Sequence, residues 1–253
     1  MEFTYLDNSA TTRVGGLATD KICEMLKNNF GNPSSLHTLG VNAYVELEKA
    51  REIVANSLRV QNKEIIFTSG GTESNNMAIL GAAFANRRKG NQIVTSAMEH
   101  PSVLETMAEL EKNSFEVIYL KPDKNGVVPT ENLMEAINDK TVLVSLMAIN
   151  NETGAYQPIE KVSEIIKLKG SPAVFHSDAI QGYGKYENAP KKLGIDLLSI
   201  SAHKVFGPKG VGALYIKDGV KMASRSFGGA QERGLRAGTE CMPLIAGFGV
   251  ANP

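Results

Sequence analysis

Short apolar runs alternate along this chain with segments whose apolar residues recur at a helical period. We predict strands at 64–68, 92–96, 115–120, 141–146, 173–176, 196–200 and 211–216. Helices are predicted at 42–58, 73–88, 102–113, 130–138 and 159–169. The strands are rich in Val, Ile and Leu without polar alternation, which indicates a sheet that is covered on both faces. Their alternation with helices predicts an α/β fold with a mostly parallel, seven-stranded sheet and helices on both faces.

The chain carries no internal repeat and no low-complexity segment, and its 253 residues can bury one sizeable core. We expect an N-terminal segment at 1–14, followed by one large domain at 15–253. Glycine-rich sequence at 227–229 and 235–239 predicts irregular structure after the last strand.

Polar residues follow five of the predicted strands. They are Ser69–Thr72, Glu99 with His100, Asn150–Gly154, Asp178 with Gln181, and Ser201–Lys204. In open α/β sheets, ligands bind beyond the carboxyl ends of the strands. The recurrence therefore predicts one binding site that is assembled from several strand ends.

Lys204 and Asp178 give this site a chemical character. Lys204 follows the strand 196–200, and Asp178 lies at the end of the preceding apolar run. A buried lysine amine can form a Schiff base with an aldehyde, and a carboxylate can hold a pyridinium nitrogen protonated. This pair is the minimum equipment for pyridoxal phosphate chemistry, although most lysines are solvated surface charges.

The stretch Ser69–Ser74 is a candidate phosphate cradle. Gly70 and Gly71 allow a ligand to approach the backbone closely. Thr72 can cap the following helix, and Glu73 adds favourable charge to its first turn. Free N–H groups and a hydroxyl also suit a phosphate dianion. A plain strand-to-helix turn and a phosphate site are equally compatible with this motif, which lacks the Gly-Lys-Ser/Thr of a Walker loop.

Five polar residues at these strand ends also have a purely local interpretation. His100 can start a helix before Pro101, or it can stack on a cofactor ring or carry protons. Asn151 can close a turn or hydrogen-bond a phenolic oxygen. Gln181 can hydrogen-bond the same oxygen or can merely be a helix-terminal amide. Asp178 can instead cap a helix, and His203 can merely orient its neighbours.

Charge, apolar run length and cysteine content argue against several classes of protein. The chain has 27 basic and 27 acidic residues without a long basic run, which argues against nucleic acid as its main partner. No apolar stretch reaches the length of a membrane span, and the first seven residues lack a signal-peptide pattern. Cys23 and Cys241 are too few for a disulfide framework, so we expect a reducing, cytoplasmic location.

Taken together, these segments resemble the class V aminotransferase superfamily of pyridoxal-phosphate-dependent enzymes (fold type I), and within it the NifS/IscS type of cysteine desulfurase. The resemblance extends over nearly the whole chain. It is carried, in family order, by 5–12, 31–37, 67–76, 99–100, 150–154, 178–181, 201–204, 207–210 and 231–240.

The resemblance implies a role for each candidate residue toward pyridoxal 5′-phosphate. It makes Lys204 the lysine that binds the cofactor covalently and Asp178 the partner of the pyridine nitrogen. His100 resembles the histidine over the cofactor ring, and with Lys204 it is the candidate proton carrier. The other implied ligands are Asn151 and Gln181 for the ring hydroxyl, Gly71, Thr72, Ser201 and His203 for the phosphate, and Thr239 for the phosphate of the partner subunit in a homodimer.

The resemblance also implies an activity. It predicts conversion of L-cysteine to L-alanine, with the sulfur passed to an enzyme cysteine as a persulfide and on to a sulfur-acceptor or iron–sulfur scaffold protein, or to tRNA thiolation. Rival interpretations are a selenocysteine lyase, another class V aminotransferase, or a non-catalytic chain that binds the cofactor or dimerises.

One departure from the family pattern changes the expectation for this chain. Family members continue into a smaller C-terminal domain that carries the nucleophilic cysteine, whereas this sequence ends at Pro253. Residues 15–253 are therefore interpreted as the cofactor-binding large domain without the small one. Neither cysteine has the setting of the family nucleophile, and we expect Cys241 to be an inert, buried thiol. The chain is accordingly expected to make no persulfide.

Overall fold

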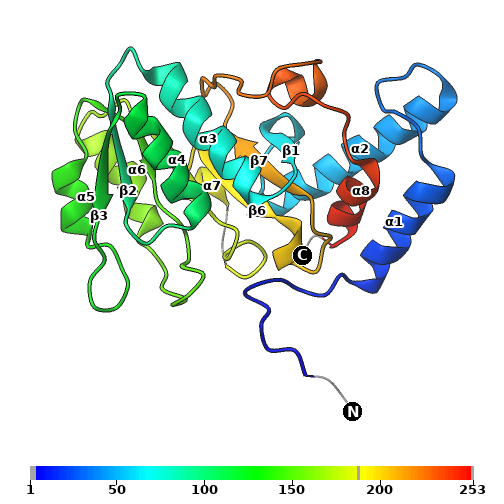
Figure 1. Ribbon diagram of the computed structural model, residues 1–253, viewed down its shortest axis with the longest axis horizontal. Coiled ribbons are helices and arrows are strands. Elements are labelled where there is room, and N and C mark those ends of the chain that lie inside the picture. The colour runs from blue at the N-terminus through cyan, green and yellow to red at the C-terminus, as the bar shows by residue number, and fades with distance from the viewer. Residues whose placement is uncertain (1–3, 187–188, 252–253) are drawn as a thin grey trace.

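A single seven-stranded sheet organises the molecule (Figure 1). The structure is a computed structural model, and it describes residues 4–186 and 189–251. The outer ends of the expected segment 1–14 and domain 15–253 (residues 1–3 and 252–253) lie outside the described residues, as do 187–188. The strands are β1 Ile65–Thr68, β2 Gln92–Ser96, β3 Glu116–Leu120, β4 Thr141–Ser145, β5 Val174–Asp178, β6 Leu197–Ser201 and β7 Gly212–Ile216.

The predicted α/β fold and its mostly parallel sheet are confirmed. The strand order is β1-β7-β6-β5-β4-β2-β3, and β7 alone runs against its neighbours β1 and β6. Every residue of β2, β4, β5, β6 and β7 is buried, whereas the edge strand β3 is partly exposed. This burial explains why the inner strands carry continuous apolar sequence rather than an alternating pattern.

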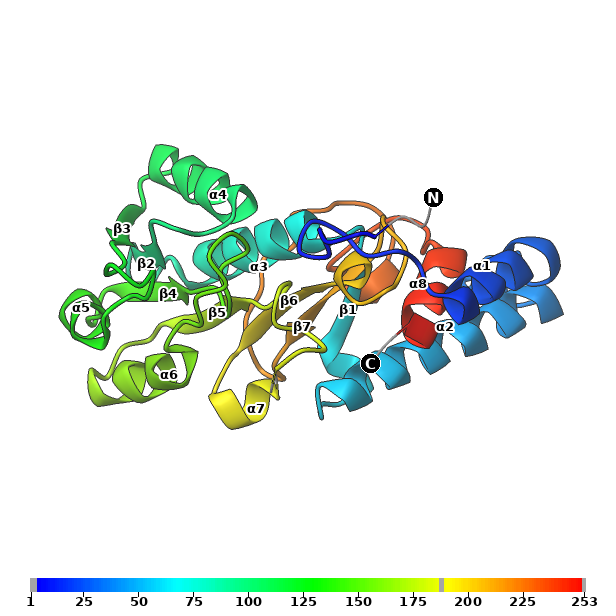
Figure 2. The same ribbon diagram turned by 90° about the horizontal axis from the view of Figure 1, so that it is seen from below.

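Helices cover both faces of the sheet, as Figure 2 shows from a second direction. One face packs against α3 and α4, and the other against α2, α5, α6 and α8. The helices are α1 Gly16–Asn28, α2 Thr38–Ser57, α3 Gly71–Asn86, α4 Pro101–Lys112, α5 Thr130–Ala136, α6 Ile159–Leu168, α7 Pro190–Leu193 and α8 Met242–Ala251. None of these described helices combines the length and apolar character needed to cross a membrane.

Some boundaries differ from the prediction for local reasons. Strand β5 continues to Asp178, because this residue pairs with Ser199 of the neighbouring strand. Helix α2 starts at Thr38 rather than 42, since the His37 side chain accepts a hydrogen bond from the N–H of Gly40. The short helix α7 and the 3-10 turns η1 (Asn62–Glu64), η2 (Ala202–Lys204) and η3 (Gln231–Gly234) carry too little periodicity to be predicted.

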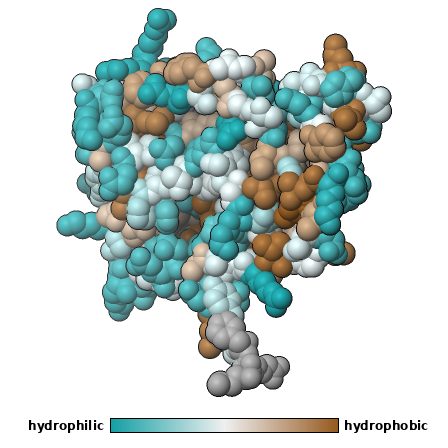
Figure 3. Space-filling model, turned by 45° about the vertical axis from the view of Figure 1, so that its right-hand side comes forward, coloured by the Kyte–Doolittle hydropathy of each residue, from teal (hydrophilic) through white to brown (hydrophobic). Residues whose placement is uncertain are grey.

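The end of the molecule formed by α1, α2 and α8 has a distinctly apolar surface. Figure 3 shows apolar side chains gathered on this side. Exposed apolar residues here are Leu17, Leu26, Phe30, Leu36, Leu39, Val41, Tyr44 and Val45. Clusters of this kind mark surfaces that contact another protein or another part of the chain.

Candidate active site

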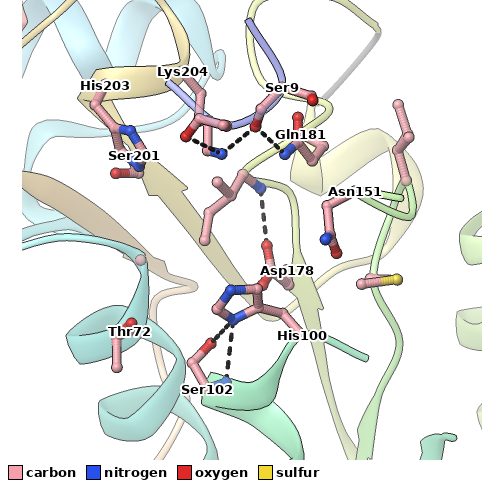
Figure 4. Close-up of a pocket in the computed structure, with 15 residues that line it drawn as sticks. Ser9, Thr72, His100, Ser102, Asn151, Asp178, Gln181, Ser201, His203 and Lys204 are labelled. Carbon is pink, nitrogen blue, oxygen red and sulfur yellow. Dashed lines mark hydrogen bonds between the residues drawn. The ribbon is translucent and has the colours of Figure 1, made fainter. Parts of the chain in front are cut away.

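A pocket of about 470 Å³ lies beyond the carboxyl ends of the parallel strands. Nine of the ten predicted site residues line it (Figure 4): Gly71, Thr72, His100, Asn151, Asp178, Gln181, Ser201, His203 and Lys204. They lie at the carboxyl ends of β1, β2, β4, β5 and β6 or in the segments that follow these strands. The fold therefore gathers residues up to 133 positions apart (71 to 204) at one edge of the sheet.

Asp178 supplies a buried carboxyl group to the pocket wall. It is the last residue of β5 and is 5% exposed. One oxygen accepts from the Ile180 N–H (3.0 Å) and the other from the side-chain amide of Asn75 (2.7 Å). Burial raises the pKa of Asp178, although these two donors act in the opposite direction. No helix begins at this point, so the alternative of a helix cap does not apply.

His100 caps helix α4 and also lines the pocket, so its local and functional interpretations are compatible. Its Nδ1 accepts a hydrogen bond from the Ser102 N–H (3.1 Å) and lies 2.8 Å from the Ser102 hydroxyl oxygen. Figure 4 shows both contacts on the same side of the imidazole ring. The ring orientation is thereby fixed by the first turn of α4.

Lys204 lies in the turn η2, directly after β6, and its amine reaches the N-terminal segment. Its Nζ donates to the carbonyl oxygens of Ser9 and of Ala10, the latter at 2.9 Å. Burial, followed by the charge of Lys185, lowers the pKa of Lys204, while Asp178 opposes the shift. A lowered pKa increases the fraction of neutral, nucleophilic amine.

The N-terminal segment around Ser9–Thr12 is held over the pocket by hydrogen bonds to the turn that carries Lys204. Thr12 donates through its N–H and its hydroxyl to the His203 carbonyl (2.9 and 3.0 Å) and accepts from the Phe206 N–H. The Gln181 amide also donates to the Ser9 carbonyl (2.9 Å). Sequence reasoning did not place Ser9 and Ala10 at the site, because their partners are more than 170 residues away.

The strand-to-helix turn after β1 opens a second hollow of about 480 Å³ beside the pocket, sharing Gly71, Thr72, Ser201 and His203 with it. Helix α3 begins at Gly71 and no side chain caps it, so the expectation that Thr72 caps this helix is wrong. Gly70 has φ of +148°, a conformation that favours glycine. The uncapped helix start faces polar side chains, an arrangement that suits an anion.

Asn151 lies in the loop after β4, and its neighbour Asn150 shapes that loop. The Asn150 Oδ1 accepts from the N–H groups of Glu152 and Thr153, while its amide donates to the Met98 carbonyl. The turn that this side chain forms leaves Asn151 at the pocket wall. Asn150 is thus the structural residue of the motif, and Asn151 is the one that a ligand can reach.

Thr239 is the one predicted site residue that lies apart from the pocket. It is exposed, in the segment that follows η3. This segment is anchored by Glu232, whose carboxylate accepts two hydrogen bonds from Arg51 (2.8 and 2.7 Å) and one from the Phe67 N–H. Glu232 and Arg233 both have positive φ, which the buried ion pair holds in place.

The cysteine expectations are partly wrong. Both Cys23 and Cys241 are exposed, so Cys241 is not the buried thiol that the apolar sequence after it suggested. It precedes α8, and only the residues from Met242 onward enter the core. Of the described residues that line the pocket, none is a cysteine.

Glu99, next to His100, is a second buried carboxyl group under the site and is 4% exposed. Its Oε1 accepts from the Met147 N–H (2.8 Å) and the Ser96 hydroxyl (3.1 Å). Burial, opposed in part by the Met147 N–H, raises the pKa of Glu99 to about 8. The Glu99 carboxyl group ties the strand end that carries His100 to the start of the Met147–Asn151 loop. No local sequence pattern predicts this contact, because Glu99 and Met147 are 48 residues apart.

Residues 4–251 match the family described as aminotransferase class-V. Cysteine desulfurase IscS of Methanosarcina thermophila is 50% identical over 248 residues, which are 98% of this chain and 61% of that protein. Cysteine desulfurase IscS of Clostridium botulinum is 47% identical over 247 residues, covering 98% of this chain and 62% of that protein.

Solved structures give the same result. A structure titled NifS-like protein has a TM-score of 0.95 and 44% identity, covering 98% of this chain and 68% of that one. A structure titled SspA in complex with cysteine has a TM-score of 0.93 and 39% identity, covering 98% and 72%. The chain therefore spans only 61–62% of the length of these curated relatives.

Proposed function

The chain belongs to the aminotransferase class-V family, and we propose that its pocket is the pyridoxal phosphate site of a cysteine desulfurase of the NifS/IscS type. The observation that carries the proposal is the convergence of Lys204, Asp178 and an uncapped helix start on one pocket. These are the three parts that a phosphorylated pyridine aldehyde requires. Residues 15–253 would form the cofactor-binding large domain.

Asp178 fits the nitrogen end of the cofactor. Both of its oxygens accept hydrogen bonds from neutral donors, and burial raises its pKa. A carboxyl group in this setting is stabilised in its ionised form by a cationic N–H that meets it in the pocket. Asp178 would therefore hold a proton on the pyridine nitrogen.

The turn at Gly71 fits the phosphate. A Cβ at this position would lie 2.1 Å from the Cδ1 of Ile180, which also lines the pocket, so a larger residue would displace the pocket wall. Helix-terminal N–H groups and the side chains of Thr72, Ser201 and His203 would bind the phosphate oxygens. The Asn151 and Gln181 amides would bind the ring hydroxyl.

Bound pyridoxal phosphate supplies an electron-withdrawing ring that stabilises negative charge on the α-carbon of an attached amino acid. Lys204 would join the cofactor through its amine, and its lowered pKa favours the neutral form that this bond requires. When an amino acid takes its place, the same amine is free to accept the α-proton. His100 would cover the ring face and orient it.

We propose L-cysteine as the substrate and L-alanine as the product, with the sulfur transferred to an enzyme cysteine. The similarity to a structure described as in complex with cysteine supports this substrate. A thiolate has to reach the substrate sulfur. Because none of the described pocket-lining residues is a cysteine, that thiolate would come from outside them and would pass sulfur to an acceptor or iron–sulfur scaffold protein.

We also propose a homodimer in which Thr239 reaches the phosphate site of the partner subunit. The exposure of Thr239 and the apolar surface at α1 and α2 support such an association. The two unpaired cysteines are consistent with the reducing cytoplasm, where we place the protein.

Covalent labelling tests the cofactor assignment. The purified chain is incubated with pyridoxal phosphate, reduced with borohydride and mapped by mass spectrometry. We expect the label on Lys204, and its loss in Lys204→Ala. Lys185→Ala is the matched control, since Lys185 is close enough to influence Lys204 electrostatically and should leave the label unchanged. A principal label on another lysine would overturn the assignment.

Substrate assays on a longer gene product distinguish the rival activities. Alanine formation from L-cysteine at a rate equal to or above that from L-selenocysteine supports a desulfurase. A strong preference for selenocysteine, or amino transfer without sulfur release, would replace the proposal with a lyase or another aminotransferase. Labelling of Lys204 without turnover of any of these substrates would indicate a non-catalytic protein that binds the cofactor.

A further inference from the structure

A continuous chain of hydrogen bonds runs beneath the pocket from Asp178 to His100. The Asn75 side-chain nitrogen donates to Asp178 Oδ2 (2.7 Å) and to the Ser102 hydroxyl oxygen (2.9 Å). The same hydroxyl lies 2.8 Å from His100 Nδ1. Asn75 is fully buried and Ser102 is 8% exposed, so the two hydrogen bonds that the Asn75 amide donates are shielded from water.

The direction of each hydrogen bond follows from the chemistry of the groups. An ionised Asp178 can only accept, so Asn75 must present its NH₂ group to it. The second hydrogen of that NH₂ group points to the Ser102 oxygen, which leaves the hydroxyl hydrogen of Ser102 free to donate to His100. The Ser102 backbone N–H also donates to His100 Nδ1 (3.1 Å), and a backbone N–H can never accept.

His100 Nδ1 is therefore an acceptor that receives two donors from one residue. In a neutral imidazole, a nitrogen that accepts carries no proton, so the proton lies on Nε2. Nδ1 has its lone pair engaged and Nε2 has none available. A neutral His100 can thus donate a hydrogen bond to a ligand, but it has no free lone pair with which to take a proton.

We propose that Ser102 and Asn75 are positioning residues that lock His100 as the Nε2–H tautomer and Asp178 as an oriented acceptor. The consequence for catalysis rests on the proposed function. His100 would stack on the cofactor ring and donate a hydrogen bond, and Lys204 would be the residue that accepts protons. This separates the roles of the two proton-carrier candidates that the sequence left together.

The network also links the two ends of a bound ring. Asp178 lies where the ring nitrogen is proposed to bind, and His100 where the ring face is proposed to lie. Asn75 on α3 and Ser102 on α4 connect them, so the two groups keep a fixed relation even when the pocket contents change. Thr106 lies one turn after Ser102 on α4. Its hydroxyl donates to the Ser102 carbonyl and takes no part in the hydrogen bonds between Asp178 and His100.

Nitrogen-15 NMR of the histidine rings tests the proposal directly, on the protein without cofactor. His100 is assigned by the signal lost in His100→Gln. We expect wild-type His100 to show a protonated Nε2 and an unprotonated Nδ1. Ser102→Ala should shift the tautomer ratio toward Nδ1–H about fivefold, which is the effect of removing one hydrogen bond. Ser102→Thr, which keeps the hydroxyl, should restore the wild-type pattern.

Thr106→Val is the matched control, because it removes a buried hydroxyl from the same helix without touching His100. It should leave the His100 nitrogen signals unchanged. In Asn75→Ala, carbon-13 NMR should show the Asp178 carboxyl group titrating at higher pH, since the Asn75 hydrogen bond lowers the pKa of Asp178.

A protonated Nδ1 in the wild-type spectrum would overturn the proposal without any variant, as would a Ser102→Ala spectrum identical to wild type in a folded protein. Because the spectra need no cofactor, these outcomes are independent of the Lys204 labelling. The tautomer can be correct in a protein that binds no pyridoxal phosphate, and labelling of Lys204 can succeed with a different tautomer.

Discussion

Two buried carboxyl groups at different places in the molecule differ in the charge of their hydrogen-bond partners. Glu232 and Asp178 are equally buried, each 5% exposed. Glu232 receives two hydrogen bonds from the guanidinium of Arg51 and one from a backbone N–H. Asp178 receives one from a backbone N–H and one from a neutral amide. The first carboxylate has its counter-charge within the fold, whereas the second faces a pocket.

The difference extends to what surrounds each group. The Arg51–Glu232 pair joins α2 to the loop after β7 and fixes backbone that is otherwise unfavourable. Around Asp178, the fold supplies neutral donors and a lysine whose amine contacts the N-terminal segment. A buried carboxyl group whose hydrogen-bond donors are all neutral favours a cationic ligand, a setting that is common in catalytic pockets.

The largest expected effect comes from breaking the self-contained pair. Arg51→Met leaves Glu232 buried without its counter-charge, and we expect the free energy of unfolding to fall by about 3–5 kcal/mol. Urea denaturation measures this change. The exposed pair Lys63–Asp218 is the control, since Lys63→Met should change stability by less than about 0.5 kcal/mol.

A double variant, Arg51→Met with Glu232→Gln, separates an unpaired charge from lost packing. Gln keeps the acceptor for the Phe67 N–H but carries no charge. We expect it to recover at least half of the lost stability. If the double variant is no more stable than Arg51→Met alone, the buried charge is not the cause, and the contrast with Asp178 loses its basis.

The next effect concerns Asp178. In Asp178→Asn, a neutral amide cannot hold a ring nitrogen protonated, but the proposed phosphate and lysine contacts remain. We expect exchange of an amino acid α-proton to slow by at least about 100-fold, while cofactor affinity changes less than about tenfold. Proton NMR in D₂O measures the exchange, and absorbance titration measures the affinity.

Ser177→Ala is the control for that variant. Ser177 precedes Asp178 on β5, is fully buried, and its hydroxyl has no hydrogen-bond partner among the described residues. It should retain near-normal exchange. Near-normal exchange in Asp178→Asn as well would show that this carboxylate resembles Glu232 and serves only the fold.

A smaller effect is expected from Glu99, the second buried acid of the pocket region. Its pKa is raised from 4.5 to about 8, so the folded protein binds this proton more tightly than the unfolded chain. The stabilisation is complete below pH 4.5 and is lost as the pH rises to about 8. We expect stability to fall by about 1 kcal/mol between pH 7 and 8, and Glu99→Gln to abolish this fall.

The range from pH 7 to 8 lies above the pH at which the buried His176 changes its protonation. The pKa of His176 is lowered from 6.5 to about 3 by burial, so its contribution is present above pH 6.5 and is lost as the pH falls. Measurements between pH 7 and 8 therefore exclude His176, and the difference between wild type and Glu99→Gln isolates the contribution of Glu99. A wild-type protein whose stability is flat over this range would contradict the protonated carboxyl group.

The smallest expected effect concerns Cys241, which lies near Glu232 rather than at the pocket. After incubation with L-cysteine and pyridoxal phosphate, persulfide-selective labelling should find no persulfide on this chain. Cys241→Ser should be indistinguishable from wild type. A label on Cys241 that is lost in Cys241→Ser would place the nucleophile in the region that we assign to structure.

Much of the pocket could be predicted from the sequence, because its residues lie at or just after strand ends. Continuous apolar runs predicted the strands, and the residues at their carboxyl ends were expected at one edge of the sheet, where nine of the predicted site residues line one pocket. The prediction failed where a residue's environment depends on packing. Cys241 was expected to be buried because apolar sequence follows it, yet the helix that enters the core starts one residue later.

The sequence by itself determined the α/β class, the approximate strands and helices, and the residues that converge on the pocket, since these follow from local periodicity and from the geometry of parallel strands. Tertiary structure alone decided the reversed direction of β7, the N-terminal segment over Lys204, the Arg51–Glu232 pair and the chain from Asp178 through Asn75 and Ser102 to His100. These contacts join groups far apart in sequence. Their partners are selected by the packing of helices on the sheet, for which local patterns carry no signal.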